Sequence, residues 1–414
     1  MSARAAAINV AVIGTGYFGG GLLRRLIALD RFTPRVAANR TVGRAVAAFR
    51  RAGVPQDELV ITDDVQTAQD AIQAGRYVAT ANLLLPTALS SIEVIAEATG
   101  DLLVGTEVAL ATIEAGKHLV AANSDVQATV GPMLKVLADR AGVVYTDIEG
   151  DEPGLLTYLI DYAQQIGLNV LVAGNGKGVL KRYATPDTQA AFAAEYGLQP
   201  WLATAAADGT KLNFEMTVVA NATGFLPAVP GMHGPAVNLA DSPLTFSELG
   251  AMDGGRYVDY ILGARGVFVI LRSEDAEIRS DFRYLKLGDG PFYILHRPEV
   301  LAHYAAPLSI DRAARRCEST VTPAGAPVAE TIAFAKRDLT PGQKVDGIGG
   351  FDLYGLIVRA DHAHAEDLLP IGIAGFARVR RAVRKDKPLT YSDVEFQIDN
   401  VALNLHRTQR AFFL

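Results

Sequence analysis

The feature that most constrains the fold is a glycine-rich turn between an apolar segment and a helical pattern near the amino terminus. Ile8–Ile13 is short and rich in β-branched residues, as expected of a strand buried on both faces of a parallel sheet. The turn Gly14–Gly19 follows it directly and reads G-T-G-Y-F-G. Leucines then recur at helical spacing, at Leu22, Leu23, Leu26 and Leu29. In this context the pattern predicts a dinucleotide-binding unit.

Each glycine of the turn has its own expected role. Gly14 permits the tight turn, Gly16 lets the backbone approach a pyrophosphate, and Gly19 lets the helix lie close to the strand. The helix amino terminus offers free N–H groups to the phosphates. We therefore count Tyr17 and Phe18, at the start of the helix, among the cofactor-binding residues. The alternative is a glycine-rich turn of some other α/β protein.

The remainder of the first 150 residues alternates between strand and helix patterns. Strands are expected near 35–38, 58–62, 92–96, 118–122 and 143–146. Helices are expected near 64–74, 103–115 and 126–141. Repeating units of this length predict an α/β fold with a doubly wound parallel sheet, a Rossmann domain over residues 1–150.

The end of the second predicted strand indicates which nicotinamide cofactor the domain prefers. NAD-specific sites usually place Asp or Glu there to bind the adenine ribose, whereas this chain has Asn39 and Arg40. The guanidinium of Arg40 can pair with a 2′-phosphate. The sequence therefore favours NADP, with NAD as the alternative. In the competing interpretation Arg40 is a solvated surface charge.

Polar residues follow two further strands at the edge where the nicotinamide half would lie. Glu97, Thr99 and Gly100 come after the strand at 92–96, and Asn123 comes after the strand at 118–122. Because the carboxyl ends of parallel strands meet at one edge of the sheet, these residues are expected to line the nicotinamide end of the cofactor site.

The middle of the chain carries the candidate catalytic residues. Lys211 lies in a segment that opens a helix, and we expect it to be the general acid/base or an oxyanion stabiliser, since a cleft can lower the pKa of a lysine. Asp208, Glu152 and Lys177 would orient the substrate. Glu215 lies one helical turn after Lys211, so the two either form a surface pair or point into a cleft. In the competing interpretation Lys177 is only an exposed lysine in a turn.

Composition excludes several classes of protein. Net charge is −6 over 414 residues, which gives no basic footprint for nucleic acid. The single cysteine, Cys317, rules out a disulfide framework and a cysteine zinc cage. No apolar run reaches the roughly 18–20 residues that cross a bilayer. The short start leaves no room for a signal peptide, so we expect a cytoplasmic protein without membrane partners.

Several motifs follow the order found in one enzyme superfamily. They are Gly14–Gly16, Glu97–Gly100, Ala121–Asn123, Gly174–Gly176 and Asp208–Lys211. In these stretches the chain resembles the homoserine dehydrogenase superfamily, whose substrate-binding Asp and catalytic Lys match Asp208 and Lys211. The resemblance implies hydride transfer and a homodimer paired through the central domains.

The whole chain is similar to a branch of that superfamily with a C-terminal SAF domain, which includes deoxyxylulose 5-phosphate reductoisomerase-like oxidoreductases. The SAF likeness rests on Ala335–Gly342 and Lys385–Val394. The branch implies a Rossmann domain at 1–150, an α+β catalytic and dimerisation domain at 151–327, and a small β-rich SAF-like module at 328–414. True homoserine dehydrogenases carry a lysine where this chain has Ser124.

The function expected from the resemblance is an NADP-dependent oxidoreductase acting on a small anionic hydroxy or oxo compound, with a reductoisomerase-like reaction. In such a reaction Asp151 or Glu152 would hold a divalent cation, although Asp151 is equally suited to cap the following helix. Homoserine dehydrogenase proper is the first alternative. An alternative of another class is a non-catalytic NADP-binding sensor or scaffold.

Overall fold

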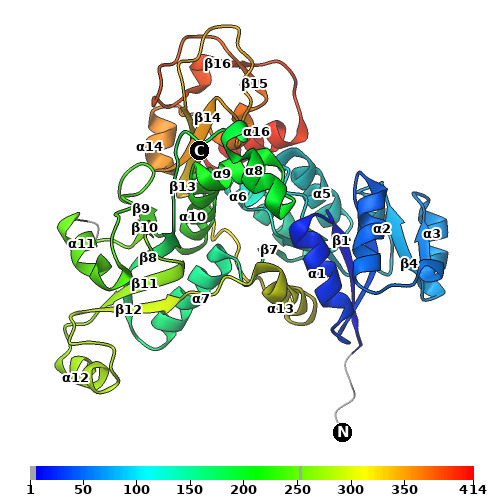
Figure 1. Ribbon diagram of the computed structural model, residues 1–414, viewed down its shortest axis with the longest axis horizontal. Coiled ribbons are helices and arrows are strands. Elements are labelled where there is room, and N and C mark those ends of the chain that lie inside the picture. The colour runs from blue at the N-terminus through cyan, green and yellow to red at the C-terminus, as the bar shows by residue number, and fades with distance from the viewer. Residues whose placement is uncertain (1–5, 251–253) are drawn as a thin grey trace.

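The structure is a computed structural model that describes residues 6–250 and 254–414. Figure 1 shows three lobes, with the N-terminal sheet on the right, the central sheet at the lower left and the C-terminal part on top. The described residues contain no helix that is long and apolar enough to cross a membrane.

The N-terminal lobe is built on a seven-stranded sheet in which every pairing is parallel, in the order β3-β4-β2-β1-β5-β6-β7. Its strands are β1 (Ile8–Ile13), β2 (Phe32–Ala38), β3 (Leu59–Ile61), β4 (Tyr77–Thr80), β5 (Val94–Glu97), β6 (His118–Ala121) and β7 (Tyr145–Asp147). The predicted α/β fold with a parallel sheet is confirmed. The strand order reverses between β1 and β5, which is where open α/β sheets bind ligands.

Helices cover both faces of this sheet. They are α1 (Tyr17–Ile27), α2 (Val42–Arg51), α3 (Val65–Gln73), α4 (Leu85–Ala88), α5 (Leu102–Glu114) and α6 (Ser124–Ala141). On one face α3 to α6 bury one hydrophobic cluster, and on the other α1 and α2 bury a second. A helix from much later in the chain, α13 (Ala302–Arg316), completes that second face with Ala306, Ile310 and Ala313.

The central lobe has a mixed five-stranded sheet in the order β12-β11-β8-β10-β9. The strands are β8 (Asn169–Lys177), β9 (Leu226–Pro227), β10 (Tyr257–Leu262), β11 (Gly266–Arg272) and β12 (Phe292–Arg297). The lobe's helices are α7 (Glu152–Gln165), α8 (Pro186–Tyr196), α9 (Pro200–Ala207), α10 (Thr210–Thr223), α11 (Ser242–Glu248) and α12 (Ala276–Tyr284). Leu156 of α7 and Met216 of α10 pack in the core of one face, and Phe246 of α11 packs on the other.

Strand β8 is longer than the sequence predicts. The residue pattern predicts a strand over Asn169–Ala173 followed by a glycine-rich turn, but the strand continues to Lys177, paired with β10 on one side and β11 on the other. The glycine at 174 serves packing, because a Cβ there would lie 2.2 Å from Cζ of Phe268. Lys177 consequently stands at the end of a central strand and not in a turn.

The C-terminal part combines short strands and isolated β-bridges with helices. It has two antiparallel pairs, β13 (Ala329–Ala335) with β14 (Leu353–Arg359) and β15 (Ala377–Val379) with β16 (Val394–Phe396). Its helices are α14 (Ala360–Ala365), α15 (Ile371–Ala374) and α16 (Val401–Phe413). Helix α16 packs against α5 and α6, and Gln409 bonds the backbone of α6 at Thr129 and Met133.

Strand β14 also holds α10. The N–H of Gly355 donates to Oγ1 of Thr210 at 2.8 Å, and the N–H of Ile357 donates to Oδ1 of Asn213 at 2.8 Å. The acceptors are buried side chains of α10, so the C-terminal part fixes the helix that carries Lys211 and Glu215.

Candidate active site

The glycine turn between β1 and α1 has the geometry that each predicted role requires. Gly14 has a φ of +88°, and a Cβ there would lie 2.5 Å from the carbonyl oxygen of Ala98. A Cβ at Gly19 would lie 1.8 Å from the oxygen of Gly14, so only glycine lets α1 sit this close. No atom lies within 4 Å of a Cβ built at Gly16. The backbone at Gly16 is therefore open to a ligand.

Hydrogen-bond donors at this turn fit a dinucleotide pyrophosphate. No side chain caps the amino terminus of α1 at Gly16, which leaves backbone N–H groups free to bind an anion. Thr15 is 2% exposed, and its Oγ1 has no hydrogen-bond partner within the described residues. A bound phosphate would supply the missing hydrogen-bond partner of this buried hydroxyl, which lies beside an open stretch of backbone.

The two residues predicted to read the adenosine end lie at the edge of the same sheet. Oδ1 of Asn39 accepts the N–H of Thr41 at 3.0 Å, a local turn bond that shapes the entry to α2. The Arg40 side chain is 71% exposed, and its guanidinium lies 3.9 Å from Oδ2 of Asp101. Arg40 is thus free to approach a phosphate. Phe18, also predicted as a cofactor-binding residue, is partly buried against the core.

The predicted nicotinamide edge comes together between β5 and β6. Glu97 is buried at the end of β5, and its Oε1 accepts the N–H of Thr99 at 2.6 Å. Burial raises the pKa of Glu97. Oδ1 of Asn123 accepts the N–H of Val126 at 3.4 Å and so begins α6. Gly100 turns the chain away with a φ of +65°.

Lys211 extends from the first turn of α10 to that edge. Its Nζ donates to Oγ of Ser124 at 2.6 Å and to Oδ1 of Asp125 at 3.3 Å. Because Ser124 follows Asn123 in the chain, the lysine lies next to the predicted nicotinamide end. Burial disfavours the charge of Lys211, but Asp125, Glu215 and neighbouring carboxylates outweigh it and raise the pKa of the lysine. The expectation of a lowered pKa is therefore wrong.

A second lysine is shared by two carboxylates. Nζ of Lys177 lies 3.3 Å from Oε1 of Glu152 and 3.5 Å from Oε2 of Glu215, which Nδ2 of Asn175 also approaches at 3.4 Å. Burial and the charge of Glu152 raise the pKa of Glu215 to about 7. Burial opposes the charge of Glu152, yet Lys177 lowers its pKa to about 2. Glu215 is therefore buried and is not part of a surface pair, and the cluster of Glu152, Lys177, Lys211 and Glu215 contains a carboxyl whose pKa is near neutral.

Sequence reasoning missed Asp147, which is almost fully buried at the end of β7. Its Oδ1 accepts the N–H of Ile148 at 2.7 Å, while its Oδ2 has no partner among the described residues. Burial raises the pKa of Asp147 to about 7, and the charge of Lys211 opposes that rise. Its position in the sequence could have identified it as a candidate site residue, because it stands at the end of a strand at the same sheet edge as Glu97.

Asp208 is not brought to the cluster. Its Oδ1 accepts the N–H of Thr210 at 2.8 Å, and its Oδ2 lies 2.8 Å from Nζ of Lys336 in the C-terminal part. Both side chains of the ion pair are buried. Asp208 therefore begins α10 and anchors it, whereas the sequence suggested that it orients the substrate.

The structure bears on the predicted cation ligands Asp151 and Glu152. Within the described ranges no three His, Cys, Asp or Glu side chains are arranged to hold a metal ion. Asp151 begins α7, where burial and the charge of Glu152 raise its pKa.

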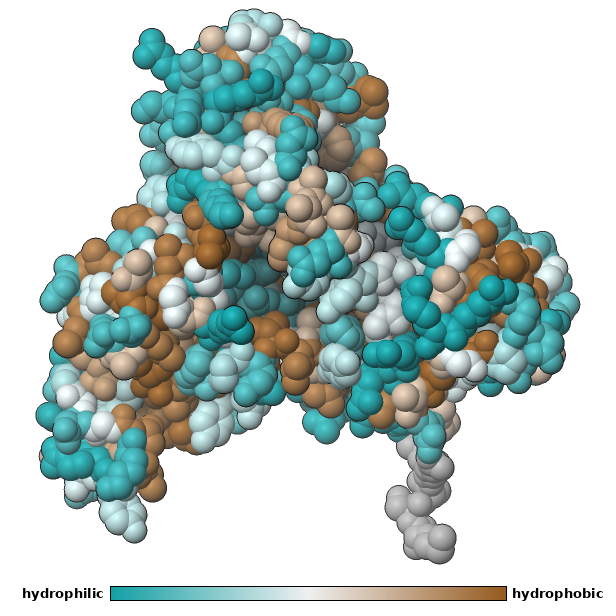
Figure 2. Space-filling view, in the orientation of Figure 1, coloured by the Kyte–Doolittle hydropathy of each residue, from teal (hydrophilic) through white to brown (hydrophobic). Residues whose placement is uncertain are grey.

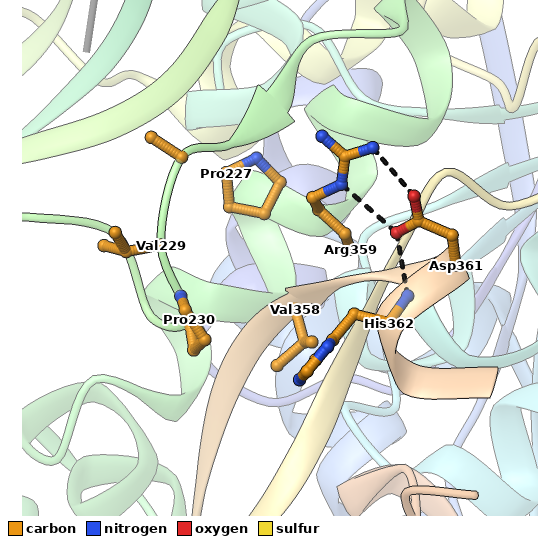
Figure 3. Close-up of a pocket in the computed structure, with 8 residues that line it drawn as sticks. Pro227, Val229, Pro230, Val358, Arg359, Asp361 and His362 are labelled. Atoms are coloured by element: carbon orange, nitrogen blue, oxygen red, sulfur yellow. Dashed lines mark hydrogen bonds and ion pairs between the residues drawn. The ribbon is translucent and has the colours of Figure 1, made fainter. Parts of the chain in front are cut away.

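A cavity of about 530 Å³ lies between β9 and β14, where Arg359 is paired with Asp361 at 2.8 Å (Figure 3). Apart from His362 its other walls are apolar, and Lys211 does not line it.

The middle of the chain matches one protein-family model. Residues 150–304 match the model described as "Oxidoreductase DRL, catalytic domain". This range contains Glu152, Lys177, Lys211 and Glu215, the acid–base residues of the cluster. The match confirms the prediction that the chain is an oxidoreductase. No curated protein matches the sequence.

Solved structures are similar to this chain at low identity. Biliverdin reductase from Synechocystis, crystallised with biliverdin and NADP+, is 15% identical over 43% of this chain and 49% of its own, with a TM-score of 0.29. The 3-ketoreductase KijD10 from Actinomadura kijaniata, crystallised with NADP, is 14% identical over 42% and 49%, with a TM-score of 0.31. The oxidoreductase yvaA of Bacillus subtilis is 16% identical over 77% and 92%, with a TM-score of 0.38. The chain spans about half the length of the first two.

Proposed function

We propose that the protein is an NADP-dependent oxidoreductase that transfers a hydride to or from a small anionic hydroxy or oxo compound. One observation carries the proposal: Nζ of Lys211 lies 2.6 Å from Oγ of Ser124, the residue after Asn123. This contact supports a role for Lys211 as a cationic proton donor beside the edge where the nicotinamide is expected. A dinucleotide and an acid–base cluster thus share the amino terminus of α6.

The cofactor proposal is supported by the glycine turn. The open backbone at Gly16 and the orphaned hydroxyl of Thr15 fit a pyrophosphate, and two similar structures were crystallised with NADP. The absence of a carboxylate at Asn39, together with the exposed Arg40, favours NADP over NAD. When bound, the nicotinamide supplies or accepts the hydride.

Residues of this chain would stabilise the negative charge that develops on the substrate oxygen and would transfer a proton to it. Lys211, held positive by its acidic neighbours, stabilises the alkoxide that forms at the substrate oxygen and donates a proton to it. Lys177 is already shared by Glu152 and Glu215, so this group suits hydrogen bonding to substrate hydroxyls better than binding a second full negative charge. Glu215, with its raised pKa, can return a proton to the cluster.

The finer assignment remains the reductoisomerase-like reaction, in which Asp151 and Glu152 would hold a divalent cation. The sequence resemblance supports it, whereas Glu152 is ion-paired with Lys177 and the described residues contain no group of three His, Cys, Asp or Glu side chains arranged for a metal ion. Homoserine dehydrogenase proper is the alternative, and Ser124 weighs against it. A sensor or scaffold would not need the buried acid–base cluster around Lys211.

Assembly as a homodimer through the central lobe and a SAF-like role for residues 328–414 are also parts of the proposal, and both rest on the sequence resemblance. On the face seen in Figure 2, hydrophobic residues gather over the central lobe at the left, while the C-terminal part above it is mostly hydrophilic. This distribution supports pairing through the central lobe.

The direct test follows NADPH absorbance with the full chain, deoxyxylulose 5-phosphate and magnesium or manganese, beside homoserine with NADP. With whichever substrate reacts, Lys211→Ala should lower kcat by about 100-fold or more, because a positioned acid contributes about that much. The dissociation constant for NADPH should not change.

The exposed lysine variant Lys387→Ala is the control and should behave as the wild type. Undiminished turnover in Lys211→Ala would remove the catalytic role. A wild-type protein that fails to bind either dinucleotide would contradict the cofactor proposal, whatever the substrate.

A further inference from the structure

The loop that follows β9 carries a histidine outside the cluster around Lys211. The loop Pro230–Pro235 reads P-G-M-H-G-P. It is tied to β14, because the N–H of Gly231 donates to the carbonyl oxygen of Ile357 at 2.8 Å. Met232 has a φ of +68°, a conformation that a residue with a side chain rarely adopts. Strain of this kind persists only where the surrounding structure fixes it, and it is common at ligand sites.

His233 of this loop forms a fixed pair with a buried carboxylate. Its Nδ1 lies 2.8 Å from Oδ2 of Asp259 on β10, whose side chain is fully buried. The same carboxylate accepts the backbone N–H groups of His233, Gly234 and Tyr260. The hydrogen bond to Asp259 raises the pKa of His233, although burial opposes the rise. Nε2 has no partner among the residues that the structure describes, so the protonated ring presents a free N–H there.

The pair lies beside the acid–base cluster of the central lobe. Figure 1 shows β8, β10 and β9 next to one another below the C-terminal part. Tyr260 on β10 is paired with Asn175 on β8, so their side chains lie on the same face of the sheet. Nδ2 of Asn175 approaches Oε2 of Glu215 at 3.4 Å, which connects this face to α10. A Cβ at Gly234 would lie 1.9 Å from Cζ of Tyr260, so the loop of His233 packs directly on that ring.

Asn175 offers a buried acceptor at this place. It is 1% exposed, and its Oδ1 has no hydrogen-bond partner within the described part of the chain. The contact of Nδ2 with Glu215 fixes which end of the amide is the oxygen. A buried acceptor without a donor is an independent sign of a polar ligand, and a ligand hydroxyl would satisfy it.

An arginine reaches the same tyrosine from the turn after β8. Arg182 is half-buried, and its guanidinium lies 5.2 Å from the ring centroid of Tyr354 on β14. Burial raises the pKa of Tyr260, the charge of Arg182 opposes that rise and the charge of Asp259 adds to it, so both charges act on one ring. Asp386 accepts the hydroxyl of Tyr354 at 3.1 Å. Within the described ranges Arg182 has no ion pair with a carboxylate.

We propose that Arg182 and His233 form the subsite for the anionic end of the substrate. The guanidinium and the N–H at Nε2 donate to its oxygens, and Oδ1 of Asn175 accepts a hydrogen bond from a neighbouring substrate hydroxyl. This inference rests on the proposed function and deepens it, because Lys177 is already shared by two carboxylates and leaves a terminal negative charge unmatched in the cluster. The substrate class is a hydroxylated compound that ends in a carboxylate or a phosphate.

NMR of the histidine rings in the full chain tests this subsite. The chain has seven histidines, and His233→Gln identifies the signal of His233 by its loss. The wild type is titrated at neutral pH with inorganic phosphate and, separately, with acetate. The His233 signal should shift saturably with at least one of these anions, and the anion with the higher affinity indicates the terminal group of the substrate.

Arg182→Ala should weaken this binding about tenfold or more, since a charge-assisted hydrogen bond is worth about that factor. Lys181→Ala is the matched control, because it removes an exposed positive charge from the adjacent position, and it should bind within about twofold of the wild type. An unresponsive His233 signal, or equal affinities in the wild type and Arg182→Ala, would overturn the inference.

Saturating NADPH distinguishes the subsite from the cofactor site. The His233 shift should persist when NADPH occupies the glycine turn, and its loss would assign the anion to the cofactor site and overturn the inference. The readout is local to one ring and uses no turnover. A chain that binds phosphate at His233 but does not bind NADPH would keep the anion site and contradict only the proposed function.

Discussion

At the scale of single residues, Ser124 occupies the central position in the candidate site. Its hydroxyl lies 2.6 Å from Nζ of Lys211, and its main chain follows Asn123 at the predicted nicotinamide edge. A serine cannot replace a lysine as a proton donor at neutral pH, but it can fix the direction of one. Under the proposed function we therefore expect Ser124 to be a positioning residue for Lys211, the charged group.

Ser124→Ala should accordingly lower kcat about tenfold, because Lys211 loses the acceptor that holds its Nζ in place. Affinity for NADPH should stay the same, since the glycine turn is untouched. Steady-state kinetics together with NADPH titration checks both values. Ser90→Ala, in the same lobe but outside the candidate site, is the control, and an unchanged kcat in Ser124→Ala would show that Asp125 alone positions the lysine.

Asp147 supplies a prediction about pH. Burial raises its pKa in the folded chain to about 7 from an ordinary value near 3.8, so folding favours the protonated form. The contribution of Asp147 to stability is thus fully present below its unfolded pKa and is lost as pH rises to about 7. In the wild type this group should lower the free energy of unfolding progressively across that window.

Asp147→Asn keeps the shape of the protonated carboxyl and cannot ionise. Denaturant unfolding at pH 5 and pH 8 should show a smaller fall in stability for this variant than for the wild type, by on the order of 1.4 kcal/mol per unit of pKa difference at most. Asp139→Asn, at a position whose side chain is 60% exposed, serves as the control and should follow the wild type. An identical fall in all three proteins would contradict the burial argument.

At the scale of elements, local patterns predicted most of the N-terminal sheet. The strand Ile8–Ile13, the glycine turn and α1 follow from periodicity and from steric needs at Gly14 and Gly19, all set by residues close in sequence. Strand β4 was missed because four residues between short helices carry almost no pattern. The extension of β8 to Lys177 was missed because glycine usually ends a strand, and only contact with Phe268 explains it.

The candidate site was predictable in part for the same reason. Glu97 and Asn123 follow strands of one parallel sheet, so topology alone places them at one edge. The sequence left open whether Lys211 and Glu215 face solvent or a cleft, because an amphipathic pattern does not show what covers a helix. The partner of Asp208 is Lys336, more than a hundred residues later, and no local signal indicates such a pair.

At the scale of the whole molecule, the buried ion pair between Asp208 and Lys336 joins the central lobe to the C-terminal part. Nζ of Lys336 also donates to the carbonyl oxygens of Ala184 and Gly350, both at 2.7 Å. One ammonium group thus ties the start of α10 to two loops. Its removal leaves a buried carboxylate and two carbonyls without their donor.

Lys336→Ala should therefore lower the free energy of unfolding by about 3–5 kcal/mol, measured by urea unfolding. The double variant Asp208→Asn with Lys336→Met should lose less, because no uncompensated buried charge remains. Lys344→Ala, elsewhere in the C-terminal part, is the control. A double variant that is less stable than Lys336→Ala would mean that the ion pair itself, and not the cost of an unpaired carboxylate, stabilises the junction.

The position of α13 has a consequence for how the chain is made. Ala306, Ile310 and Ala313 complete the face of the N-terminal sheet that α1 and α2 leave open, although they follow it by more than 150 residues. Because the ribosome synthesises the chain from its amino terminus, the N-terminal sheet keeps an uncovered apolar surface until α13 has emerged. The nascent first lobe is thus the stage of biogenesis at which a chaperone would be needed, and a gene fragment that stops at codon 150 should yield an aggregating product.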